Sequence, residues 1–227
     1  METKHFEAIF DAVLTRVEQA RLRVNDHRIV KIVGASKSAT PEMIETMYRI
    51  GQRCFGENKV QDMSEKVHAL SHLPLEWHFI GRLQTNKINQ LIDLEPLLMH
   101  SLSSLELAQE LDKRLAIKGK TMNVLLQINS AYEEQKAGVL PEATLDIYDQ
   151  IQLTCKNLHL KGVMSIGAHV EETSVIQKSF ETTYRLFEAL QTKGAKYCSM
   201  GMSQDFELAI ACGSNMIRLG SILFKQA

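Results

Sequence analysis

The chain has 227 residues and a formal net charge of −1 at pH 7. This length can bury a sizeable core and suits one large α/β domain or two small ones. A near-neutral charge without a basic block argues against nucleic acid as the main partner. The absence of an apolar run of about eighteen residues argues against a membrane span.

The cysteines indicate a reducing compartment. The four of them are far apart in the sequence and form no C-x-x-C pair: Cys54, Cys155, Cys198 and Cys212. This pattern predicts buried free thiols, and neither a disulfide framework nor a zinc site. We therefore expect a cytoplasmic protein.

The first 23 residues predict an extra helix ahead of the main fold. One helical face carries the apolar side chains Phe6, Ile9, Phe10, Val13, Leu14 and Val17. Charged residues interrupt the segment throughout, so it is not a signal peptide. We expect this helix to cap the rest of the domain.

The stretch from Arg28 to Lys37 is apolar on both faces, which predicts a fully buried strand of a parallel sheet. Lys37 stands where that strand ends, and ligands of parallel α/β folds bind at the carboxyl ends of the strands. If it is buried, desolvation lowers the pKa of its ammonium and makes the amine a better nucleophile toward carbonyls. A lysine that simply reaches solvent is the other interpretation of this stretch.

The remaining chain alternates helix and strand patterns. Thr40 and Pro41 begin a helix that ends at Gly51, and Ser103 and Glu106 have capping-box spacing before a stripe of Leu107, Leu111 and Leu115. Further strands are predicted over 53–55, 76–81, 97–102, 122–129, 160–168, 196–202 and 215–220. Eight such units favour a single-domain (β/α)₈ TIM barrel over residues 1–227, although a doubly wound sheet uses the same alternation.

In a barrel, the residues at the strand ends would converge on one face. They are Lys37, Asn58, His78, Arg82, His100, Asn129, Met164, Ser199, Ser203 and Arg218. The late segments 199–203, 213–215 and 220–221 carry hydroxyls and glycines where such barrels commonly bind phosphate. Taken singly, Ser203 is equally typical of a helix N-cap, and Gly213 of a helix C-cap.

A phosphate site, a strand-end lysine and Arg218 together suggest pyridoxal 5′-phosphate (PLP) as cofactor, because its aldehyde forms a Schiff base with lysine. An arginine facing the pyridine nitrogen disfavours the protonated ring, which then becomes a weak electron sink. A salt bridge elsewhere in the barrel is the alternative role for Arg218.

Several motifs resemble the pyridoxal-phosphate homeostasis protein family, whose barrel is that of alanine racemase. They are V-G-A-S-K, F-G-E-N-K-V-Q, W-H-F-I-G-R-L-Q-T-N-K, S-M-G-M-S-x-D and G-S-N-x-x-R-L-G, within residues 29–224. The resemblance implies that Lys37 carries the Schiff base and that Arg218 faces the pyridine nitrogen. It further implies that the phosphate lies among Ser199, Ser203, Gly220 and Ser221, with Asn58 and Met200 near the ring.

The chain departs from the family pattern in three places. The first strand reads V-G-A-S before Lys37, the segment 166–169 lacks a proline-containing turn, and residues 223–227 lack the usual Phe-Gly and basic tail. The roles of His78, Arg82 and His169 are left open.

We expect a PLP-binding homeostasis protein without a robust catalytic activity. The related racemases take a second base, a tyrosine, from an additional domain for which this chain leaves no room. An enzyme is the competing class: a weak racemase-like activity, or a class I aldolase with His78 and His100 as acid–base partners of Lys37. A scaffold that uses the polar loop 129–140 is a third possibility. Other expected partners are further B6 vitamers and PLP-dependent apoenzymes, and we expect a monomer with no metal.

Overall fold

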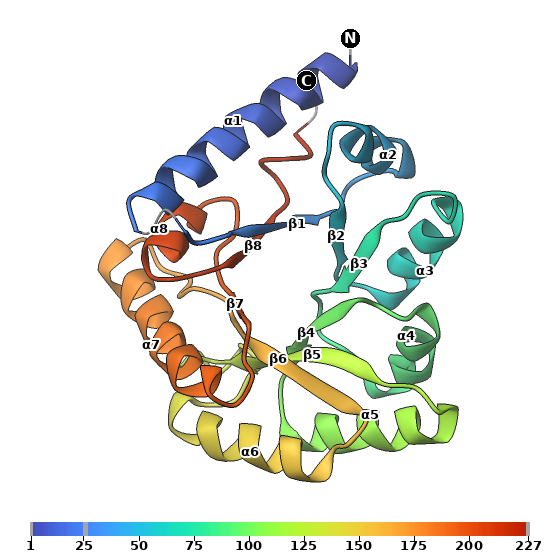
Figure 1. The fold of residues 1–227 in the computed structure, drawn as a ribbon, viewed down its shortest axis with the longest axis vertical. Helices are drawn as coiled ribbons and strands as arrows, with labels where there is room; N and C mark the ends of the chain where they lie inside the picture. The colour runs from blue at the N-terminus through green and yellow to red at the C-terminus, as the bar shows by residue number, and fades with distance from the viewer. Residues whose placement is uncertain (1, 25–26, 226–227) are drawn as a thin grey trace.

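In the computed structural model, which describes residues 2–24 and 27–225, eight parallel strands close into a barrel in chain order (Figure 1). This confirms the predicted (β/α)₈ architecture over a doubly wound sheet. The strands are β1 Lys31–Ala35, β2 Cys54–Glu57, β3 Glu76–Phe79, β4 Leu98–Leu102, β5 Met122–Ile128, β6 Leu158–Ser165, β7 Tyr197–Ser199 and β8 Met216–Leu219.

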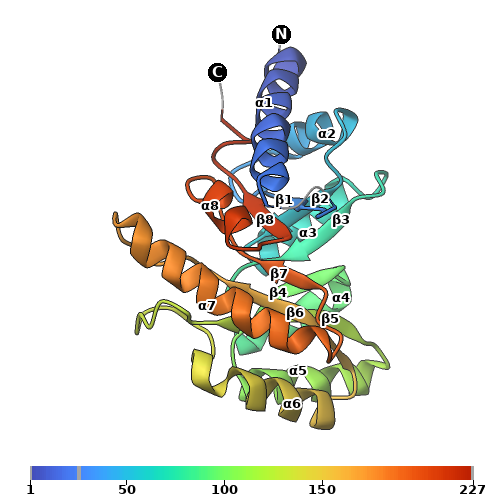
Figure 2. The same cartoon turned by 60° about the vertical axis from the view of Figure 1, so that its left-hand side comes forward.

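Helices surround the barrel, as the two views show (Figure 2). They are α1 Glu2–Leu22, α2 Pro41–Arg49, α3 Val60–Ala69, α4 Ile88–Leu94, α5 Leu105–Lys118, α6 Thr144–Thr154, α7 Thr173–Gln191 and α8 Phe206–Ala211. Short 3₁₀ turns, Thr85–Lys87 and Pro141–Ala143, precede α4 and α6. Among the described residues, no helix has the length and apolar character needed to cross a membrane.

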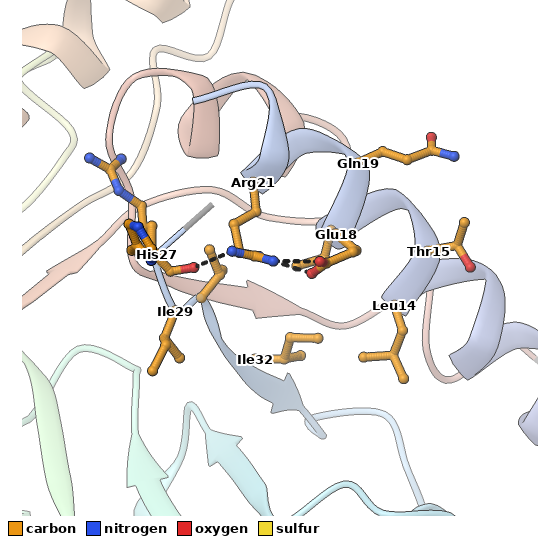
Figure 3. A pocket seen from close by; sticks show the side chains of 11 residues that line it. Leu14, Thr15, Glu18, Gln19, Arg21, His27, Ile29 and Ile32 are labelled. Atoms are coloured by element: carbon orange, nitrogen blue, oxygen red, sulfur yellow. Dashed lines mark hydrogen bonds and ion pairs between the residues drawn. The ribbon is translucent and has the colours of Figure 1, made fainter. Parts of the chain in front are cut away.

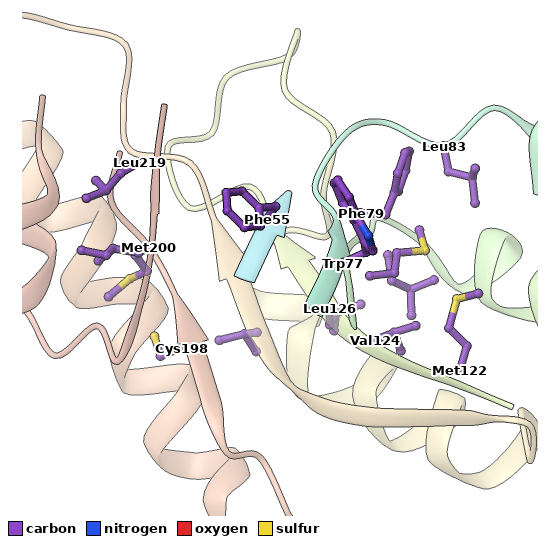
Figure 4. Packing of buried hydrophobic residues seen from close by; sticks show 14 of the residues in the cluster. Phe55, Trp77, Phe79, Leu83, Met122, Val124, Leu126, Cys198, Met200 and Leu219 are labelled. Carbon is purple, nitrogen blue, oxygen red and sulfur yellow. The ribbon is translucent and has the colours of Figure 1, made fainter. Parts of the chain in front are cut away.

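The hydrophobic core lies mainly between the strands and the helices. Alternate strand residues point outward into this layer, where Phe55, Phe79, Leu126 and Leu219 pack with the helix side chains (Figure 4). The inward-facing residues form a smaller apolar cluster of Val33, Cys54, Leu98, Leu125, Met164 and Met216. Buried polar side chains fill much of the remaining barrel interior, which sets this barrel apart from the usual branched apolar filling.

The helix α1 lies outside the barrel, beside α8 and α2 (Figure 1). Phe6, Phe10, Val13 and Val17 are buried as predicted, whereas Leu14 is exposed. Arg16 forms an ion pair with Glu207 of α8 at 2.8 Å. The expectation that this helix caps the barrel is therefore wrong: α8 has only six residues, and α1 extends the outer ring of helices next to it.

The predicted strands differ from the observed ones by one to three residues at an end, and two of these differences have a clear physical cause. The first strand begins at Lys31, where pairing with Met216 starts, so Ile29 lies outside the sheet and is 83% exposed. The prediction of a fully buried strand from Arg28 is therefore wrong at its first residues. The sixth strand ends at Ser165 because the backbone beyond it bonds to other elements: the N–H of Ala168 donates to Ser179 Oγ, and that of His169 to Glu133.

Two helix starts show how the caps act. Thr40 caps α2 and Pro41 is its first residue, as predicted. The cap of α5 is Ser104, whose side chain accepts the N–H of Leu107 at 3.2 Å, so the expected capping box of Ser103 and Glu106 is out of register by one residue. Ala108, Leu111 and Leu115 form the buried stripe of this helix, and Leu107 is only partly buried.

The four cysteines are free, as predicted. Cys54, Cys155 and Cys198 are buried, and Cys212 is partly buried.

The cap assignment predicts a difference between two neighbouring serines. We expect Ser104→Ala to lower the free energy of unfolding by about 1 kcal/mol, because the N–H of Leu107 loses its acceptor. Ser103→Ala is the matched control and should change stability by less than about 0.5 kcal/mol. Urea unfolding followed by circular dichroism measures both, and equal losses would contradict the assignment.

Candidate functional site

The carboxyl ends of β1, β2 and β8 lie next to one another. Gly34 pairs with Leu219 and Ala35 pairs with Gly56. The chain therefore leaves these strands at one edge of the barrel, toward Lys37, Asn58 and Gly220. This confirms that the segments carrying these predicted site residues meet on one face.

Arg218 is buried in the barrel interior, where its guanidinium makes three hydrogen bonds. Its Nη1 donates to the carbonyl and to the hydroxyl of Ser199, at 2.9 and 2.7 Å, and its Nη2 donates to the carbonyl of Ser165 at 2.9 Å. Burial lowers the pKa of Arg218 to about 10, so it remains a cation at neutral pH. The alternative role in a salt bridge is not what the structure shows, since its hydrogen-bond acceptors are two carbonyls and a hydroxyl.

The loop after β7 meets the loop after β8 through Ser203. Its hydroxyl oxygen accepts the backbone N–H groups of Gly220 and Ile222, at 3.2 and 3.4 Å. Ser203 is therefore not the cap of α8, a position that Asp205 holds. Gly201 has a φ of +93°, and a Cβ there would come within 2.7 Å of Ala209, so the tight turn in this loop requires glycine.

The segment 213–215 is not part of the same face. It precedes β8, whereas Gly220 and Ser221 follow it. The Ser214 hydroxyl is fully buried and bonds to the carbonyls of Cys198, Met200 and Met216. This segment fastens β8 to β7, and Gly213, with a φ of +107°, follows the C-cap of α8.

Lys37 lies in the turn after β1 with its side chain exposed. The burial on which the argument for an activated amine depended is therefore absent. Its backbone is held in place from below, because Ser36 is fully buried and its N–H donates to the carbonyl of Gly56 at 3.0 Å.

A buried ion pair supports this turn. Lys66 of α3 donates to the carbonyl of Ser36 and to Glu57 Oε1, both at 2.7 Å, and the Ser36 hydroxyl donates to the same carboxylate oxygen at 2.6 Å. Glu57 is fully buried, and its Oε2 has no hydrogen-bond partner among the described residues. The turn that carries Lys37 is thus fixed to β2 and α3.

The other strand-end residues divide into interior and rim. His78 and His100 are buried inside the barrel, where His78 Nδ1 and His100 Nε2 are 2.8 Å apart. Burial is the main cause that lowers the pKa of His78 to about 3 and that of His100 well below its usual value. Both rings are therefore neutral and lie beneath the site.

Two more predicted residues flank the site. Asn58 is partly buried, and its Oδ1 is shielded from solvent without a partner among the described residues. Met200 is fully buried after β7. Arg82, His169 and Ser221 are exposed, and Asn129 is committed to the carbonyls of Glu133 and Lys136.

Sequence reasoning missed Ser36, Glu57 and Lys66 as a unit, and it missed Ser165 and the N–H of Ile222. A signal for Glu57 existed, since a carboxylate ends an otherwise apolar strand directly after glycine. Nothing in the helix that carries Lys66 distinguishes it from a solvated lysine.

A cavity of about 720 Å³ lies elsewhere, between α1 and β1 (Figure 3). Apolar side chains from both elements, Leu14 and Ile32 among them, face it, and Arg21 bonds to Glu18 beside it. It contains none of the site residues that the sequence predicts.

The barrel and its loops define a class of protein: the family model for the N-terminal domain of alanine racemase matches residues 10–227. A pyridoxal phosphate homeostasis protein of Helicobacter pylori is 58% identical over 216 residues, which cover 95% of this chain and 96% of that protein. The chain therefore belongs to the pyridoxal phosphate homeostasis protein family.

Solved structures agree with this assignment. A crystal structure of an unknown protein from Bifidobacterium adolescentis superimposes with a TM-score of 0.92 at 29% identity, covering 98% of this chain and 95% of that one. PipY of Synechococcus elongatus, solved with PLP bound, superimposes with a TM-score of 0.79 at 30% identity, covering 92% and 98%.

The buried ion pair generates a stability prediction. We expect Glu57→Gln or Lys66→Met alone to cost about 3–5 kcal/mol of unfolding free energy, because each leaves a buried charge unpaired. The double variant should lose clearly less than the sum. Denaturant unfolding measures all three.

The exposed pair of Glu45 and Arg49 provides the control. Glu45→Gln should change the free energy of unfolding by less than about 1 kcal/mol. Additive losses in the Glu57 and Lys66 variants would show that the two side chains do not depend on each other.

Proposed function

We propose that this protein binds PLP and acts in its homeostasis, holding the cofactor as a Schiff base on Lys37. The observation that carries the proposal is that β1, which leads into Lys37, pairs with β8, which carries the buried Arg218 and leads into two directed backbone N–H groups. The name of its relatives and the PLP bound in PipY support it.

The residues present fit this cofactor. The N–H groups of Gly220 and Ile222 already converge on one oxygen, that of Ser203, as a phosphate oxygen requires. In this proposal Ser203, Gly220 and Ser221 surround the phosphate. Ser199, which is also predicted there, is fully buried with its hydroxyl bonded to Arg218 and His100. Asn58 and Met200 lie near the ring, and the unpartnered Asn58 Oδ1 is available to a ligand donor.

Arg218 gives the site its chemical character. When bound, the cofactor supplies an electron sink whose strength depends on protonation of its pyridine nitrogen. A permanent cation facing that nitrogen disfavours the protonated form. Ser199 and Ser165 hold the guanidinium in one orientation, so it cannot turn away.

A binding role is favoured over catalysis for a second reason. Acid–base chemistry at Lys37 needs a titratable partner within reach of the substrate. His78 and His100 are buried, neutral and bonded to each other, which weighs against the aldolase alternative. A weak racemase-like activity is the remaining enzymatic alternative, and an assay of alanine racemisation on the loaded protein tests it.

The proposal extends to the setting of the protein. Its free thiols suit the cytoplasm. We further propose that it acts as a monomer, that other B6 vitamers enter the same site, and that PLP-dependent apoenzymes receive the cofactor. The exposure of Lys37 supports exchange, because a ligand bound there has a path to solvent.

Lys37 is the test of the proposal. We expect the wild-type protein to show the absorbance of a PLP Schiff base, which borohydride reduces and peptide mapping places on Lys37. Lys37→Ala should lose the band while far-ultraviolet circular dichroism stays unchanged, because the side chain is exposed. Lys59→Ala, which removes another exposed lysine near Asn58, should keep it.

A protein that takes up no PLP, or a Lys37→Ala variant with an unaltered spectrum, would contradict the assignment. If Lys37→Ala takes up PLP but lacks the Schiff-base band, PLP binding does not depend on the covalent bond.

A further inference from the structure

A continuous hydrogen-bonded chain runs through the barrel interior from Arg218. Its Nη1 is 2.7 Å from Ser199 Oγ, which lies 3.1 Å from His100 Nδ1, and His100 Nε2 lies 2.8 Å from His78 Nδ1. Arg218 is on the side of the proposed cofactor site. His78 is at the opposite end, toward the amino ends of the strands.

The direction of this chain follows from its members. A guanidinium only donates, so Ser199 Oγ accepts from Arg218 and its one proton goes to His100 Nδ1. Neutral His100 then carries its proton on Nε2 and donates it to His78 Nδ1, which places the proton of His78 on Nε2. In the opposite direction His100 Nδ1 would donate to Ser199 Oγ, and the proton of the buried Ser199 hydroxyl would then have no acceptor.

The chain ends in an unsatisfied donor. His78 is 1% exposed, and its Nε2 has no hydrogen-bond partner among the described residues. A buried N–H without an acceptor is costly, so this group calls for one. His78 lines a cavity of about 150 Å³ at the floor of the barrel, opposite the face that carries Lys37.

The wall of this floor cavity is basic. Lys31, Lys161 and Lys196 line it together with the Asn123 amide and Tyr197, and none of its described lining residues is acidic. Lys161 and Lys196 have no ion-pair partner within the described part of the chain. A volume of this size equals roughly five waters, which suits a small ligand and excludes a nucleotide.

We propose that the floor cavity binds a small oxyanion, inorganic phosphate or a small carboxylate, which accepts the N–H of His78 Nε2 and pairs with Lys161 and Lys196. Such a ligand satisfies the last open donor of the chain. It also neutralises two cations that face a common space.

A metal ion is the competing occupant. Cys54 Sγ, a Glu76 oxygen and a His78 ring nitrogen lie within 4.8 Å of one another. The ammonium of Lys31 already occupies this cluster, bonded to Glu76 at 2.7 Å, and burial is the main cause that raises the pKa of Cys54 to about 12. A cation would have to displace Lys31 and remove the proton of the thiol. An oxyanion requires neither, and the Glu76 carboxylate near His78 is already paired with Lys31.

The floor cavity is coupled to the other face. An anion that accepts from His78 Nε2 polarises and strengthens the hydrogen bonds of the whole chain up to Arg218. This coupling rests on the proposed function, in which Arg218 faces the cofactor. Occupancy of the floor should therefore slow PLP release by about fivefold.

The test uses the full chain with ¹⁵N-labelled histidine, without PLP, titrated with inorganic phosphate and with succinate. We expect one or both to shift the Nε2 resonance of His78 in long-range ¹H–¹⁵N spectra. Lys161→Gln combined with Lys196→Gln should weaken the response about tenfold. The control combines Lys113→Gln with Lys178→Gln, two exposed lysines outside the cavity, and should bind as wild type.

The test substitutes the two lysines and leaves His78 unchanged, because a substitution of that buried residue could disturb the fold. A response to phosphate alone or to succinate alone supports the site and identifies the ligand class. If neither anion shifts the resonance, the oxyanion site is overturned. It is also overturned if only Zn²⁺ gives a response and Cys54→Ser abolishes that response. Because the titration needs no PLP, a failure of the floor site can be distinguished from a failure of cofactor binding. An unchanged rate of PLP release in the loaded protein overturns only the coupling.

Discussion

The arrangement of the site depends on a buried positive charge that has no carboxylate as hydrogen-bond partner among the residues that the structure describes. Arg218 projects into the barrel from β8, and its guanidinium is stabilised by the carbonyls of Ser165 and Ser199 and by the Ser199 hydroxyl. No carboxylate is bonded to the guanidinium among the described residues, and the charge of Asp205 acts on it only from a distance, so most of its field remains available to a ligand. A carboxylate in the same place would hold the guanidinium equally well but cancel its field.

The two ends of the barrel are built differently, and the hydrogen-bonded groups from Arg218 to His78 run between them. On the ligand side, loops from β1, β7 and β8 approach closely and present backbone donors. Beneath them, two neutral histidines replace the branched apolar side chains that usually fill such barrels. Rigidity on the ligand side comes from the buried pair of Glu57 and Lys66, which fixes the turn after β1 although Lys37 itself is exposed.

The sequence predicted most of the fold, because strand and helix periodicity are local properties. Eight alternating units and the start of α2 at Thr40 and Pro41 needed only neighbouring residues. Errors arose where a choice depended on distant partners. The cap of α5 moved from Ser103 to Ser104, and β1 starts only where β8 is available to pair with Lys31.

The sequence predicts which segments meet on one face of the barrel, but not the contacts that cross from one element to another. The sequence predicts Arg218 and Ser203 for the proposed site, but it does not predict their hydrogen-bond partners, since Ser165 and Ile222 carry no signal of their own. The hydrogen bonds among Ser36, Glu57 and Lys66 join the turn after β1, the strand β2 and the helix α3, which only the folded barrel brings together.

The burial of the cysteines has a consequence for chemoselectivity. Burial raises the pKa of Cys54 to about 12, that of Cys212 to about 11, and those of Cys155 and Cys198 as well. Thiolates, the reactive form, are therefore scarce at neutral pH. A carbonyl electrophile that reaches this protein meets nitrogen nucleophiles and almost no thiolates. The addition products are therefore hydrolysable imines, and the electrophile is not lost as thiol adducts.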